Sequence, residues 1–463
     1  MAGLCGADPL GGALGKHLAL IGFMGAGKST IGREVAGRTA RPFVDTDTEI
    51  ERLHGPIPEL FGRGEPEFRR IEEQVVAEAL AGPPAVIALG GGAVLSEKTR
   101  ERLGAHAYTI LIDVDVDDAW ERVKGSNRPL AQDPDAFRRL YDERQAIYQQ
   151  SLQWAADDPD DVLLGALRVR VRGRLLDFGQ AIVVADERVL QLHPPPVEGT
   201  TLALPAGEAA KKLSVVERLW TEIETGRQGL VLAFGGGSTT DVVGFVAATY
   251  LRGIAWMAVP TTLTGMVDAA IGGKTGINTE EGKNLAGAFH FPELVLIDPD
   301  YLATLPEAER RAGMAEVVKT GLLAGQEVWK LDEDEMIRAC AAYKAGVVLS
   351  DPFEKEGRRT ILNLGHTFAH ALETGSGYTV THGQAVALGL VAALRLSGLS
   401  TDPVDELLRP EPVAADLDAA WAALKRDKKG EGVFVLLEAP GKPIVTTVSD
   451  DDARAALASL IRK

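Results

Sequence analysis

Short apolar runs that end in glycine-rich loops and lead into helical stretches occur in two separate series along this chain of 463 residues. The first series contains LALIGF, RPFVDTD, PAVIALGGGAV and YTILIDVDV, and the second begins with AIVVADE at Ala181. Strands that alternate with helices form parallel sheets, and ligands then bind at the carboxyl ends of the strands. The pattern therefore predicts an α/β fold in which one parallel sheet follows another along the chain.

The chain is long enough for about three domains of roughly 150 residues each. Beyond about Pro299 the strands give way to long apolar periodic runs such as GQAVALGLVAALRL, which are typical of helices. The second part of the chain is thus predicted to have an α/β half followed by an α-helical half. The expected limits are residues 16–158 for the first domain and 159–463 for the second, whose halves cover about 175–302 and 303–463.

Two segments are interpreted as connections between regular elements. The stretch Trp154–Asp161 (WAADDPDD) is acidic and contains proline, as expected of an exposed connection that few contacts cross. We place the junction between the two domains within residues 155–178. The segment ERVLQLHPPPVEG in the second domain is interpreted as a loop.

The charge balance excludes several kinds of partner. Lys and Arg number 49 and Asp and Glu 66, which gives a net charge of −17 that repels nucleic acid and acidic lipid. No apolar run reaches the ~18 residues that a spanning helix needs. The two cysteines, Cys5 and Cys340, form no disulfide framework. We expect a soluble cytoplasmic protein that acts on small molecules and concentrates its positive charge locally.

The segment Gly22–Ser29 matches the pattern G-x-x-x-x-G-K-S between a predicted strand and a predicted helix. Glycines allow backbone N–H groups to surround phosphates, and the helix N-terminus adds partial positive charge. Lys28 is placed to reach the outer phosphates, and Ser29 to bind Mg²⁺. The predicted ATP-binding residues are Gly25, Ala26, Gly27, Lys28, Ser29 and Thr30.

The residues around this loop resemble shikimate kinase over nearly all of residues 17–154. The resemblance lies in DTD at Asp45–Asp47, EFRRIE at Glu67–Glu72, GGGAV at Gly90–Val94, RPL at Arg128–Leu130, and Arg144. It implies that ATP is used with Mg²⁺, that Asp45 helps Ser29 to place the metal ion, and that Arg128 belongs to a lid over ATP. It also implies that shikimate is bound by Asp47, Arg69, Gly91 and Arg144, and that Lys28, Asp47 and Arg128 take part in catalysis.

Physical chemistry agrees with these roles. Arginine forks bind a carboxylate such as that of shikimate in a bidentate manner. A carboxylate such as Asp47 can orient the hydroxyl to be phosphorylated or take its proton. Alternative interpretations are that Arg69 and Glu72 form only a solvated pair one helical turn apart, and that Gly90–Gly92 is only a turn.

The second domain contains another glycine-rich loop and a group of candidate metal ligands. Gly235–Asp241 (GGGSTTD) follows the strand GLVLAF, so that bare backbone and a helix N-terminus can face a pyrophosphate, while Asp186 can accept from a ribose hydroxyl. One carboxylate, Glu316, and the histidines His366, His370 and His382 offer the ligands of a catalytic Zn²⁺ site. From spacing alone, His366 and His370 form a ligand pair on one helix face.

Residues 180 to 440 resemble 3-dehydroquinate synthase. The matching motifs include PTT at Pro260–Thr262, GGKT at Gly272–Thr275, GKN at Gly282–Asn284, AEVVK at Ala315–Lys319 and NLGH at Asn363–His366. The resemblance implies that Glu316, His366 and His382 bind Zn²⁺ or Co²⁺, whereas His370 contacts the substrate. The loop Ser238–Thr240 departs from the apolar and glycine residues usual at that position.

The resemblance also implies the reaction. NAD⁺ oxidises a ring hydroxyl of 3-deoxy-D-arabino-heptulosonate 7-phosphate, phosphate leaves, the hydride returns, and ring closure gives 3-dehydroquinate. The implied catalytic residues are Asp268, Lys274, Lys319 and His370. The implied substrate-binding residues are Arg252, Asn284, Lys344, Arg359, Asn363 and Lys428. The implied NAD-binding residues are Asp186, Glu208, Lys211, Gly235, Gly236, Asp241, Thr261, Thr262, Lys274, Lys283 and Thr304.

Other functions remain open from the sequence. The second domain could be another sugar-phosphate cyclase or a polyol dehydrogenase, and the first another small-molecule kinase. One domain could also be a binding module that has lost its chemistry, although both retain their reactive groups. The presence of two activities of one pathway favours shikimate and dehydroquinate. A homodimer formed through the synthase domain is a further hypothesis.

Overall fold

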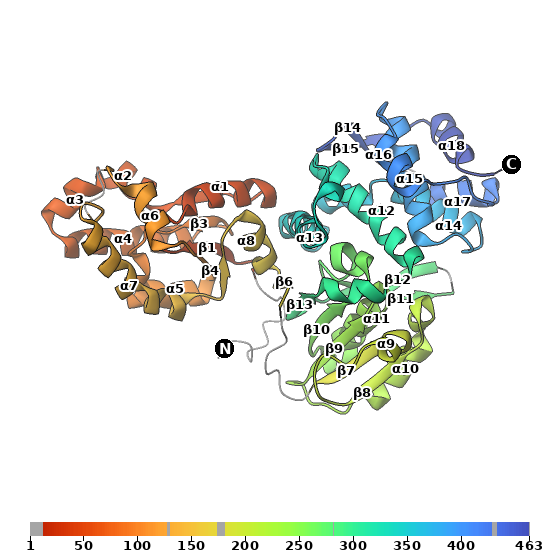
Figure 1. Cartoon of the computed structure of the whole chain (residues 1–463), viewed down its shortest axis with the longest axis horizontal. Coiled ribbons are helices and arrows are strands. Elements are labelled where there is room, and N and C mark those ends of the chain that lie inside the picture. Colours follow the sequence, from red (N-terminus) through yellow and green to blue (C-terminus); the bar gives the residue numbers. More distant parts are fainter. Residues whose placement is uncertain (1–12, 127–129, 174–180, 281, 428–432, 463) are drawn as a thin grey trace. The chain divides into compact units, whose positions relative to one another are not determined.

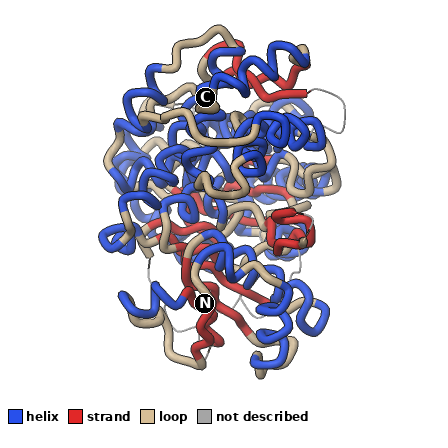
Figure 2. Tube along the Cα trace, turned by 90° about the vertical axis from the view of Figure 1, so that its right-hand side faces the viewer, coloured by secondary structure: helices blue, strands red, loops and turns tan. Residues whose placement is uncertain are grey.

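The protein is described by a computed structural model that covers residues 13–126, 130–173, 181–280, 282–427 and 433–462. The chain divides into two compact units. In both units, strands (red) are bordered by helices (blue), as Figure 2 shows. The first unit consists of residues 1–168 with 345–350, and the second of 169–344 with 351–463.

The first unit contains a five-stranded parallel sheet with the strand order β2-β3-β1-β4-β5. Its central strand is completely buried, because a parallel sheet is covered by helices on both faces and its strands are therefore apolar throughout. The strands are β1 (His17–Ile21), β2 (Phe43–Asp45), β3 (Val86–Ala88), β4 (Ala107–Ile112) and β5 (Trp154–Ala156).

Helices lie on both sides of this sheet (Figure 1). Their apolar residues pack with the strands into one core, in which Phe23, Phe137 and Tyr148 are the largest buried side chains. The helices are α1 (Lys28–Thr39), α2 (Thr46–His54), α3 (Ile57–Arg63), α4 (Glu65–Leu80), α5 (Glu97–His106), α6 (Val116–Val123), α7 (Pro134–Ser151) and α8 (Pro159–Ala166), with a short 3₁₀ turn at Ala93–Leu95.

The acidic stretch that we interpreted as an exposed connection is part of this unit. Asp158 caps α8 by accepting a hydrogen bond of 3.0 Å from the backbone N–H of Asp161, and residues 162–166 of the helix are buried. The interpretation was wrong because acidic residues also favour the first turn of a helix, where the helix dipole is positive. Strand β6 (Val169–Val171) of the second unit begins only three residues after α8 ends.

The second unit contains a six-stranded parallel sheet with the order β6-β13-β10-β9-β7-β8. Its strands β7, β9 and β10 end at Asp186, Gly235 and Pro260, so the corresponding loops meet at one edge of the sheet. The strands beyond β6 are β7 (Ile182–Asp186), β8 (Thr201–Leu204), β9 (Leu230–Gly235), β10 (Ala255–Pro260) and β13 (Leu294–Ile297).

Further elements accompany this sheet. Part of the segment predicted as a loop forms helix α9 (Glu187–Leu192), because the Asp186 carboxylate accepts from the Arg188 N–H and caps the helix. An antiparallel hairpin joins β11 (Lys274–Thr279) to β12 (Gly282–Phe289). The other elements are α10 (Leu213–Glu222), α11 (Gly237–Thr249), a π-turn at Gly265–Ala269 and 3₁₀ turns at Gly207–Ala210, Tyr250–Arg252 and Pro299–Thr304.

The last part of the chain is mainly helical, as predicted, and lies above the sheet in the view of Figure 1. Its buried leucines, valines and alanines form one large core. The sequence did not predict the antiparallel hairpin of β14 (Val433–Ala439) and β15 (Lys442–Thr447) in this part. The helices are α12 (Glu307–Ala324), α13 (Glu333–Ser350), α14 (His366–Gly375), α15 (His382–Leu396), α16 (Asp402–Leu408), α17 (Leu417–Asp427) and α18 (Asp450–Ser459), with 3₁₀ turns at Val328–Lys330 and Arg358–Asn363.

Among the described residues, no helix is both long enough and apolar enough to cross a membrane.

Candidate active sites

The loop between β1 and α1 has the geometry of a phosphate-binding loop. Gly22 has a φ of 140°, and a Cβ atom there would lie 2.4 Å from the backbone oxygen of Ile112, so only glycine fits. Lys28 is the first residue of α1, and its ammonium group donates to the carbonyls of Gly22 (2.8 Å) and Phe23 (2.9 Å). The lysine is thus held over the loop at the positive end of the helix dipole, where an anionic phosphate is favoured.

The two residues predicted to place Mg²⁺ are in direct contact. Ser29 Oγ donates to Asp45 Oδ2 at 2.5 Å, although one residue lies in the first turn of α1 and the other ends strand β2. The other oxygen of Asp45 accepts from the Thr48 N–H at 3.2 Å and so caps α2. A hydroxyl and a fixed carboxylate are suitable oxygen ligands for Mg²⁺, which usually keeps several waters.

A pocket of about 440 Å³ begins at this loop. Its wall includes both predicted magnesium ligands and the four residues predicted to bind shikimate. The structure thus brings together residues from four helices, from the end of strand β2 and from the loop after β3. The lining residues named in the predictions are Ser29, Asp45, Asp47, Arg69, Gly91 and Arg144.

Arg69 is held inside this pocket by two carboxylates. Its guanidinium donates to Glu72 at 2.6 Å and to Glu65 at 3.0 Å. Glu72 is only 3% exposed, so this is not the solvated pair that the spacing also allowed. Burial raises the pKa of Glu72, and the nearby Asp47 adds to the rise, while Arg69 opposes it.

The three-glycine loop is more than a turn. A Cβ atom on Gly92 would lie 2.1 Å from Nη1 of Arg69, and one on Gly90 would lie 2.5 Å from Oδ1 of Asp47. Side chains at these positions would displace the two groups predicted to hold the substrate. The loop therefore provides the space that the charged side chains occupy.

Helix α7 supports the same loop from the opposite side. The carbonyl of Gly91 accepts from Arg144 Nη1 at 3.3 Å and from the Tyr148 hydroxyl at 2.6 Å. Burial raises the pKa of Tyr148 to about 12, so its hydroxyl remains protonated and can donate. No sequence motif singled out Tyr148, although its spacing of four residues from Arg144 places both on one helix face. Arg128, predicted to cover ATP, lies outside the described residues.

In the second unit, helix α11 begins at the edge where β9 ends. Its first residue is Gly237, and no side chain caps its N-terminus, so backbone N–H groups there are available to an anion. A Cβ atom on Gly236 would lie 2.9 Å from the Thr262 side chain, which shows how closely the two loops approach. The hydroxyl of Ser238, one of the departures from the family pattern, donates to Glu208 at 3.3 Å.

Several of the other residues predicted to bind NAD lie at this edge of the sheet or pair with residues of α11. Lys211, which is 2% exposed, pairs with Asp241 at 2.6 Å and also donates to Asn284. Burial raises the pKa of Asp241 above its usual value, and the neighbouring Lys211 offsets only part of the rise. Thr304 contacts Nε2 of His193 at 2.7 Å. The remaining residues of this set at the strand ends are Asp186, Gly235, Thr261 and Thr262.

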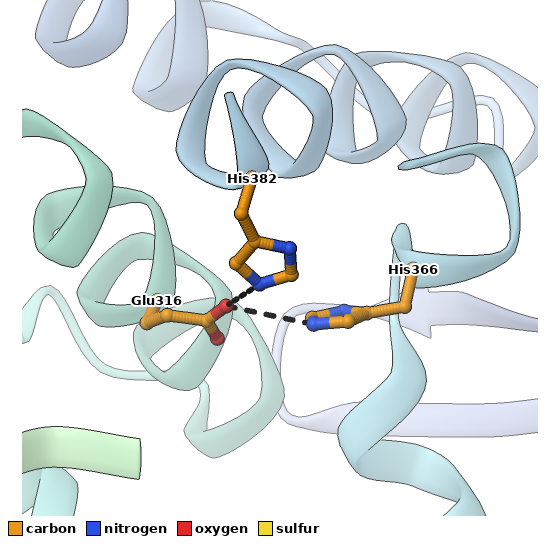
Figure 3. Close-up of side chains that lie close together, drawn as sticks. All are labelled: Glu316, His366 and His382. Carbon is orange, nitrogen blue, oxygen red and sulfur yellow. Dashed lines mark ion pairs between the residues drawn. The ribbon is translucent and has the colours of Figure 1, made fainter. Parts of the chain in front are cut away.

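Glu316, His366 and His382 form the one group of three or more potential ligands that the described residues contain. Glu316 lies on α12, and the two histidines are the first residues of α14 and α15. Figure 3 shows the three side chains pointing toward one another. Oε1 of Glu316 lies 3.5 Å from Nε2 of His366 and 3.4 Å from Nε2 of His382. All ligand atoms lie within 4.8 Å of one another, which suits a Zn²⁺ or Co²⁺ ion with one open position.

His370 does not belong to this group. Its ring centroid lies 5.8 Å from that of His366, but the side chain is exposed. The pairing inferred from spacing was therefore wrong, because His382 is brought in from the next helix and spacing within one helix cannot reveal it. The ligand set implied by the family resemblance, Glu316 with His366 and His382, is the one that the structure brings together.

A second carboxylate, Glu373, lies behind His382. Its Oε1 is 3.6 Å from Nδ1 of His382 and 3.1 Å from Nζ of Lys283. Burial alone would lower the pKa of His382, but Glu316 and Glu373 on its two sides raise it to about 10. The pKa of Glu373 is held at about 2 despite its burial, by His382 and Lys283.

Two buried lysines and the carboxylate of Asp268 adjoin the metal ligand Glu316. Lys319 pairs with Glu316 at 2.5 Å and with Asp268 at 3.5 Å, while Lys344 pairs with Asp268 at 2.9 Å. Burial opposes ionisation of all four groups, and their opposite charges compensate for it. As a result the pKa of Lys319 is raised and that of Asp268 is lowered, whereas burial lowers the pKa of Lys344.

The cations implied to bind the synthase substrate are only partly gathered among the residues that the structure describes. Arg359 is buried, and its guanidinium donates to the carbonyls of Gly272 and Pro352. Oε1 of Glu354 lies 3.6 Å from Nε of Arg359 and also forms an ion pair with Lys274. Arg252 is exposed, and among the described residues no hydrogen bond or ion pair joins it to this cluster. Asn363 is exposed, and Lys428 lies outside the described residues.

Three family models match the chain in succession. They are described as shikimate kinase (residues 24–161), 3-dehydroquinate synthase N-terminal (residues 201–312) and 3-dehydroquinate synthase C-terminal (residues 313–429). The 3-dehydroquinate synthase of Salinibacter ruber is 41% identical over 324 residues, which cover 61% of this chain and 88% of that protein. That of Mycobacterium leprae is 40% identical over 334 residues, which cover 63% and 92%.

Solved structures of other cyclases resemble the same part of the chain. A 2-deoxy-scyllo-inosose synthase complexed with carbaglucose-6-phosphate, NAD⁺ and Co²⁺ has a TM-score of 0.55 at 25% identity, covering 61% of this chain and 91% of that one. A 2-epi-5-epi-valiolone synthase from Streptomyces hygroscopicus with NAD⁺ and Zn²⁺ bound has a TM-score of 0.57 at 27% identity, covering 63% and 96%.

Proposed function

Because the chain belongs to the 3-dehydroquinate synthase family and carries a shikimate kinase domain before the synthase, we propose that it is a bifunctional enzyme of the shikimate pathway. One activity transfers a phosphoryl group from ATP to shikimate and forms shikimate 3-phosphate. The other converts 3-deoxy-D-arabino-heptulosonate 7-phosphate to 3-dehydroquinate with release of phosphate. The observation that carries the proposal is that each unit gathers side chains suited to its own reaction: the pocket beside the phosphate-binding loop in the first unit and the ligand group at Glu316 in the second.

In the kinase, the protein positions the reactants and stabilises charge. Lys28 and the N–H groups at the start of α1 hold the phosphates of ATP, and Ser29 with Asp45 would hold Mg²⁺. Arg69 and Arg144 bind the shikimate carboxylate. Asp47, on the same pocket wall, orients the hydroxyl that attacks and accepts its proton.

In the synthase, the edge of the sheet at Gly236 and Thr262 binds NAD⁺, and Glu316, His366 and His382 would hold Zn²⁺ or Co²⁺. When they are bound, NAD⁺ accepts a hydride and returns it, and the metal ion acts as a Lewis acid on the hydroxyl being oxidised. The lysines beside the metal ligands would keep positive charge near the anionic substrate. Further groups proposed to contact the substrate are Lys274, Asn284, Arg359, Asn363 and His370.

Dehydroquinate is favoured over the products of other cyclases by the relatives. The compared 3-dehydroquinate synthases are 40–41% identical to this chain, and the compared solved cyclases of other specificity 25–27%. The attached kinase acts in the same pathway. A cytoplasmic location and a homodimer formed through the synthase domain complete the proposal.

The proposal can be tested with the purified chain. It is incubated with shikimate and ATP, and separately with the seven-carbon phosphate and NAD⁺, and the products are identified by mass spectrometry. We expect shikimate 3-phosphate from the first mixture, and dehydroquinate with phosphate from the second. Net production of NADH in the second mixture would contradict the proposal, because a synthase returns its hydride and a polyol dehydrogenase does not.

The metal requirement is tested in the same assay. We expect a strong chelator, or the substitution His382→Ala, to stop phosphate release from the seven-carbon substrate, because one or all of the bonds to the ion are lost. The kinase serves as the internal control, after the chelator is removed and Mg²⁺ is restored. Turnover by protein that elemental analysis shows to be metal-free would exclude a catalytic metal ion.

A further inference from the structure

The two histidines of the ligand group direct the same ring nitrogen at Glu316. Nε2 of His366 and Nε2 of His382 lie 3.5 Å and 3.4 Å from the same carboxylate oxygen (Figure 3). The other nitrogen, Nδ1, of each ring therefore faces away from the group. Nδ1 of His366 lies 3.2 Å from the backbone oxygen of Leu364, and Nδ1 of His382 lies 3.6 Å from Oε1 of Glu373.

This arrangement has a chemical consequence. A neutral imidazole carries one proton, and a metal ion needs the lone pair of the other nitrogen. An acceptor at Nδ1 keeps the proton there and leaves Nε2 free, and it also fixes the plane of the ring. The two histidines differ in the group that faces Nδ1, which is a neutral carbonyl at hydrogen-bond distance for His366 and a carboxylate at ion-pair distance for His382.

We propose that Glu373 is a positioning residue that holds His382 with Nδ1 protonated and Nε2 directed at the metal ion, a role that rests on the metal site of the proposed function. Glu373 is only 4% exposed, so water cannot readily take its place as the acceptor. It lies on α14, whereas His382 begins α15. The carboxylate thus fixes the position of one ligand relative to the helix that carries the other, His366.

The same carboxylate oxygen has a second partner. Lys283 of strand β12 lies 3.1 Å from it and also lies over the ring of Tyr378, 4.8 Å from the ring centroid. Tyr378 belongs to the segment between α14 and α15 that leads to His382. Lys283 neutralises the buried carboxylate, and through it the hairpin predicted to contact NAD is connected to a predicted metal ligand.

An alternative role for Glu373 is purely structural, as a link between Lys283 and helix α14. The two roles differ in what they predict for the metal. If Glu373 only links the hairpin to the helix, Lys283→Met should affect metal binding as much as Glu373→Gln does. If Glu373 positions His382, its own substitution should weaken metal binding and Lys283→Met should leave the affinity nearly unchanged.

The test uses the full-length protein after removal of metal. Co²⁺ is added to the unsubstituted protein and to Glu373→Gln, Glu373→Ala and Lys283→Met, and binding is followed by visible absorption and by competition with a chelator. Thr374→Ala is the matched control, because Thr374 adjoins Glu373 but its hydroxyl donates only to the His370 carbonyl. We expect both Glu373 variants to bind Co²⁺ about 10- to 100-fold more weakly and to show an altered spectrum at saturation. Lys283→Met and Thr374→Ala should match the unsubstituted protein in Co²⁺ affinity and in the spectrum at saturation.

Each other outcome has a definite meaning. If the Glu373 variants bind Co²⁺ with the same affinity and spectrum as the unsubstituted protein, the inference is overturned and the metal site stands. The same holds if Lys283→Met weakens Co²⁺ binding as much as Glu373→Gln does. Failure of the unsubstituted protein to bind Co²⁺ or Zn²⁺ would instead overturn the metal site itself. If the Glu373 variants do not fold, ¹⁵N NMR of histidine in the Zn²⁺-loaded, unsubstituted protein decides. Protonated Nδ1 and metal-bound Nε2 of His382 support the inference, and metal bound to Nδ1 overturns it.

Discussion

The two glycine-rich loops at the ends of β1 and β9 are both proposed to bind phosphate groups, but they differ in where their positive charge comes from. Both lie at the carboxyl end of a parallel strand, and both lead into a helix whose N-terminus has no side-chain cap. The first loop carries its own cation, Lys28, as the first residue of the helix. The second has no charged side chain before Asp241, and the buried cation that pairs with Asp241 is Lys211, which precedes helix α10 in the chain.

This difference corresponds to what the phosphates do in the two proposed reactions. In the kinase a phosphoryl group is transferred, so charge develops at the phosphate and a fixed cation stabilises the transition state. In the synthase the pyrophosphate of NAD⁺ only anchors the cofactor, and backbone N–H groups with a partial helix charge are sufficient. The comparison predicts that single substitutions have a large effect in the first loop and smaller, separable effects in the second.

The largest effect is expected for Lys28→Ala. Loss of the ammonium group removes stabilisation of the transferred phosphoryl group and should lower kcat of the kinase by about 10²- to 10³-fold. The rate is measured as ATP-dependent formation of shikimate 3-phosphate. Phosphate release by the synthase in the same protein should be unchanged. Phosphorylation at nearly the wild-type rate would show that this loop does not bind the nucleotide.

A smaller effect is expected for Lys211→Met. The substitution leaves Asp241 partly buried without its cation, which should cost about 2 kcal/mol of stability and weaken NAD⁺ binding. Burial already raises the pKa of Asp241 and Lys211 opposes the rise, so the pKa should increase further in the variant. A carboxyl group with a raised pKa binds its proton more tightly in the folded state, so its contribution to stability is present at low pH and lost as the pH rises. The deficit relative to the wild type should therefore be smaller at acidic pH.

The loss of stability is measured by denaturant unfolding at several pH values, and the loss of NAD⁺ affinity is measured by titration with NAD⁺. The double variant Lys211→Met/Asp241→Asn provides the control. It should regain most of the stability, because no unpaired charge remains, but not the affinity for NAD⁺. Recovery of both would show that Lys211 acts only by neutralising Asp241.

A still smaller effect is expected for Gly236→Ala. The added methyl group would lie 2.9 Å from the Thr262 side chain, so the two loops must separate slightly. A strain of about 1.4 kcal/mol corresponds to a tenfold weaker binding of NAD⁺. Gly226→Ala is the matched control, since a methyl group there meets no atom within 4 Å. Equal NAD⁺ affinities in the two variants would place the cofactor elsewhere.

No effect on either activity is expected when the two enzymes are separated into fragments. Dehydroquinate must be dehydrated and reduced before it becomes shikimate, and this chain has no domain assigned to those steps, so the two sites need not exchange an intermediate. Fragments should be cut between residues 168 and 169, because α8 belongs to the first unit and β6 to the second. We expect each fragment to keep the activity that it has in the full chain. Folded fragments that are inactive alone and regain activity on mixing would reveal a functional interface.

Much of the fold followed from patterns that are local in the sequence. Apolar runs, glycine loops and helical periods were sufficient to predict two parallel sheets and the helical last part, but the edge strand β5 lies in the stretch that was interpreted as a connection. Local signals misled where one composition suits two structures, as in Asp157–Asp161, where acidic residues begin a helix. The hairpin of β14 and β15 was not predicted, and the exact limits of the two enzymes stay a prediction.

The sites were less accessible to sequence reasoning because they combine distant elements. Spacing favoured the pair His366 and His370 and left His382, on another helix, as one of three candidate histidines, and only the family resemblance selected His382 over His370. Glu72 and Glu373 were not singled out, because a glutamate on a helix is usually solvated. One signal was available for Glu373, which lies seven residues after His366 and therefore on the same helix face among buried apolar residues.

The strand order of the second sheet has a consequence for how the chain folds as it is synthesised. The first sheet is complete in sequence order once β5 and α8 have been made, so its domain can fold while the rest of the chain is still being translated. Strand β6 is made immediately afterwards, but its partner β13 (Leu294–Ile297) is the last strand of its sheet to appear. Until then, β6 has an unpaired edge on the ribosome-bound chain, and such edges favour mispairing. Strand β6 therefore waits longer for its partner during translation than any other strand of this sheet.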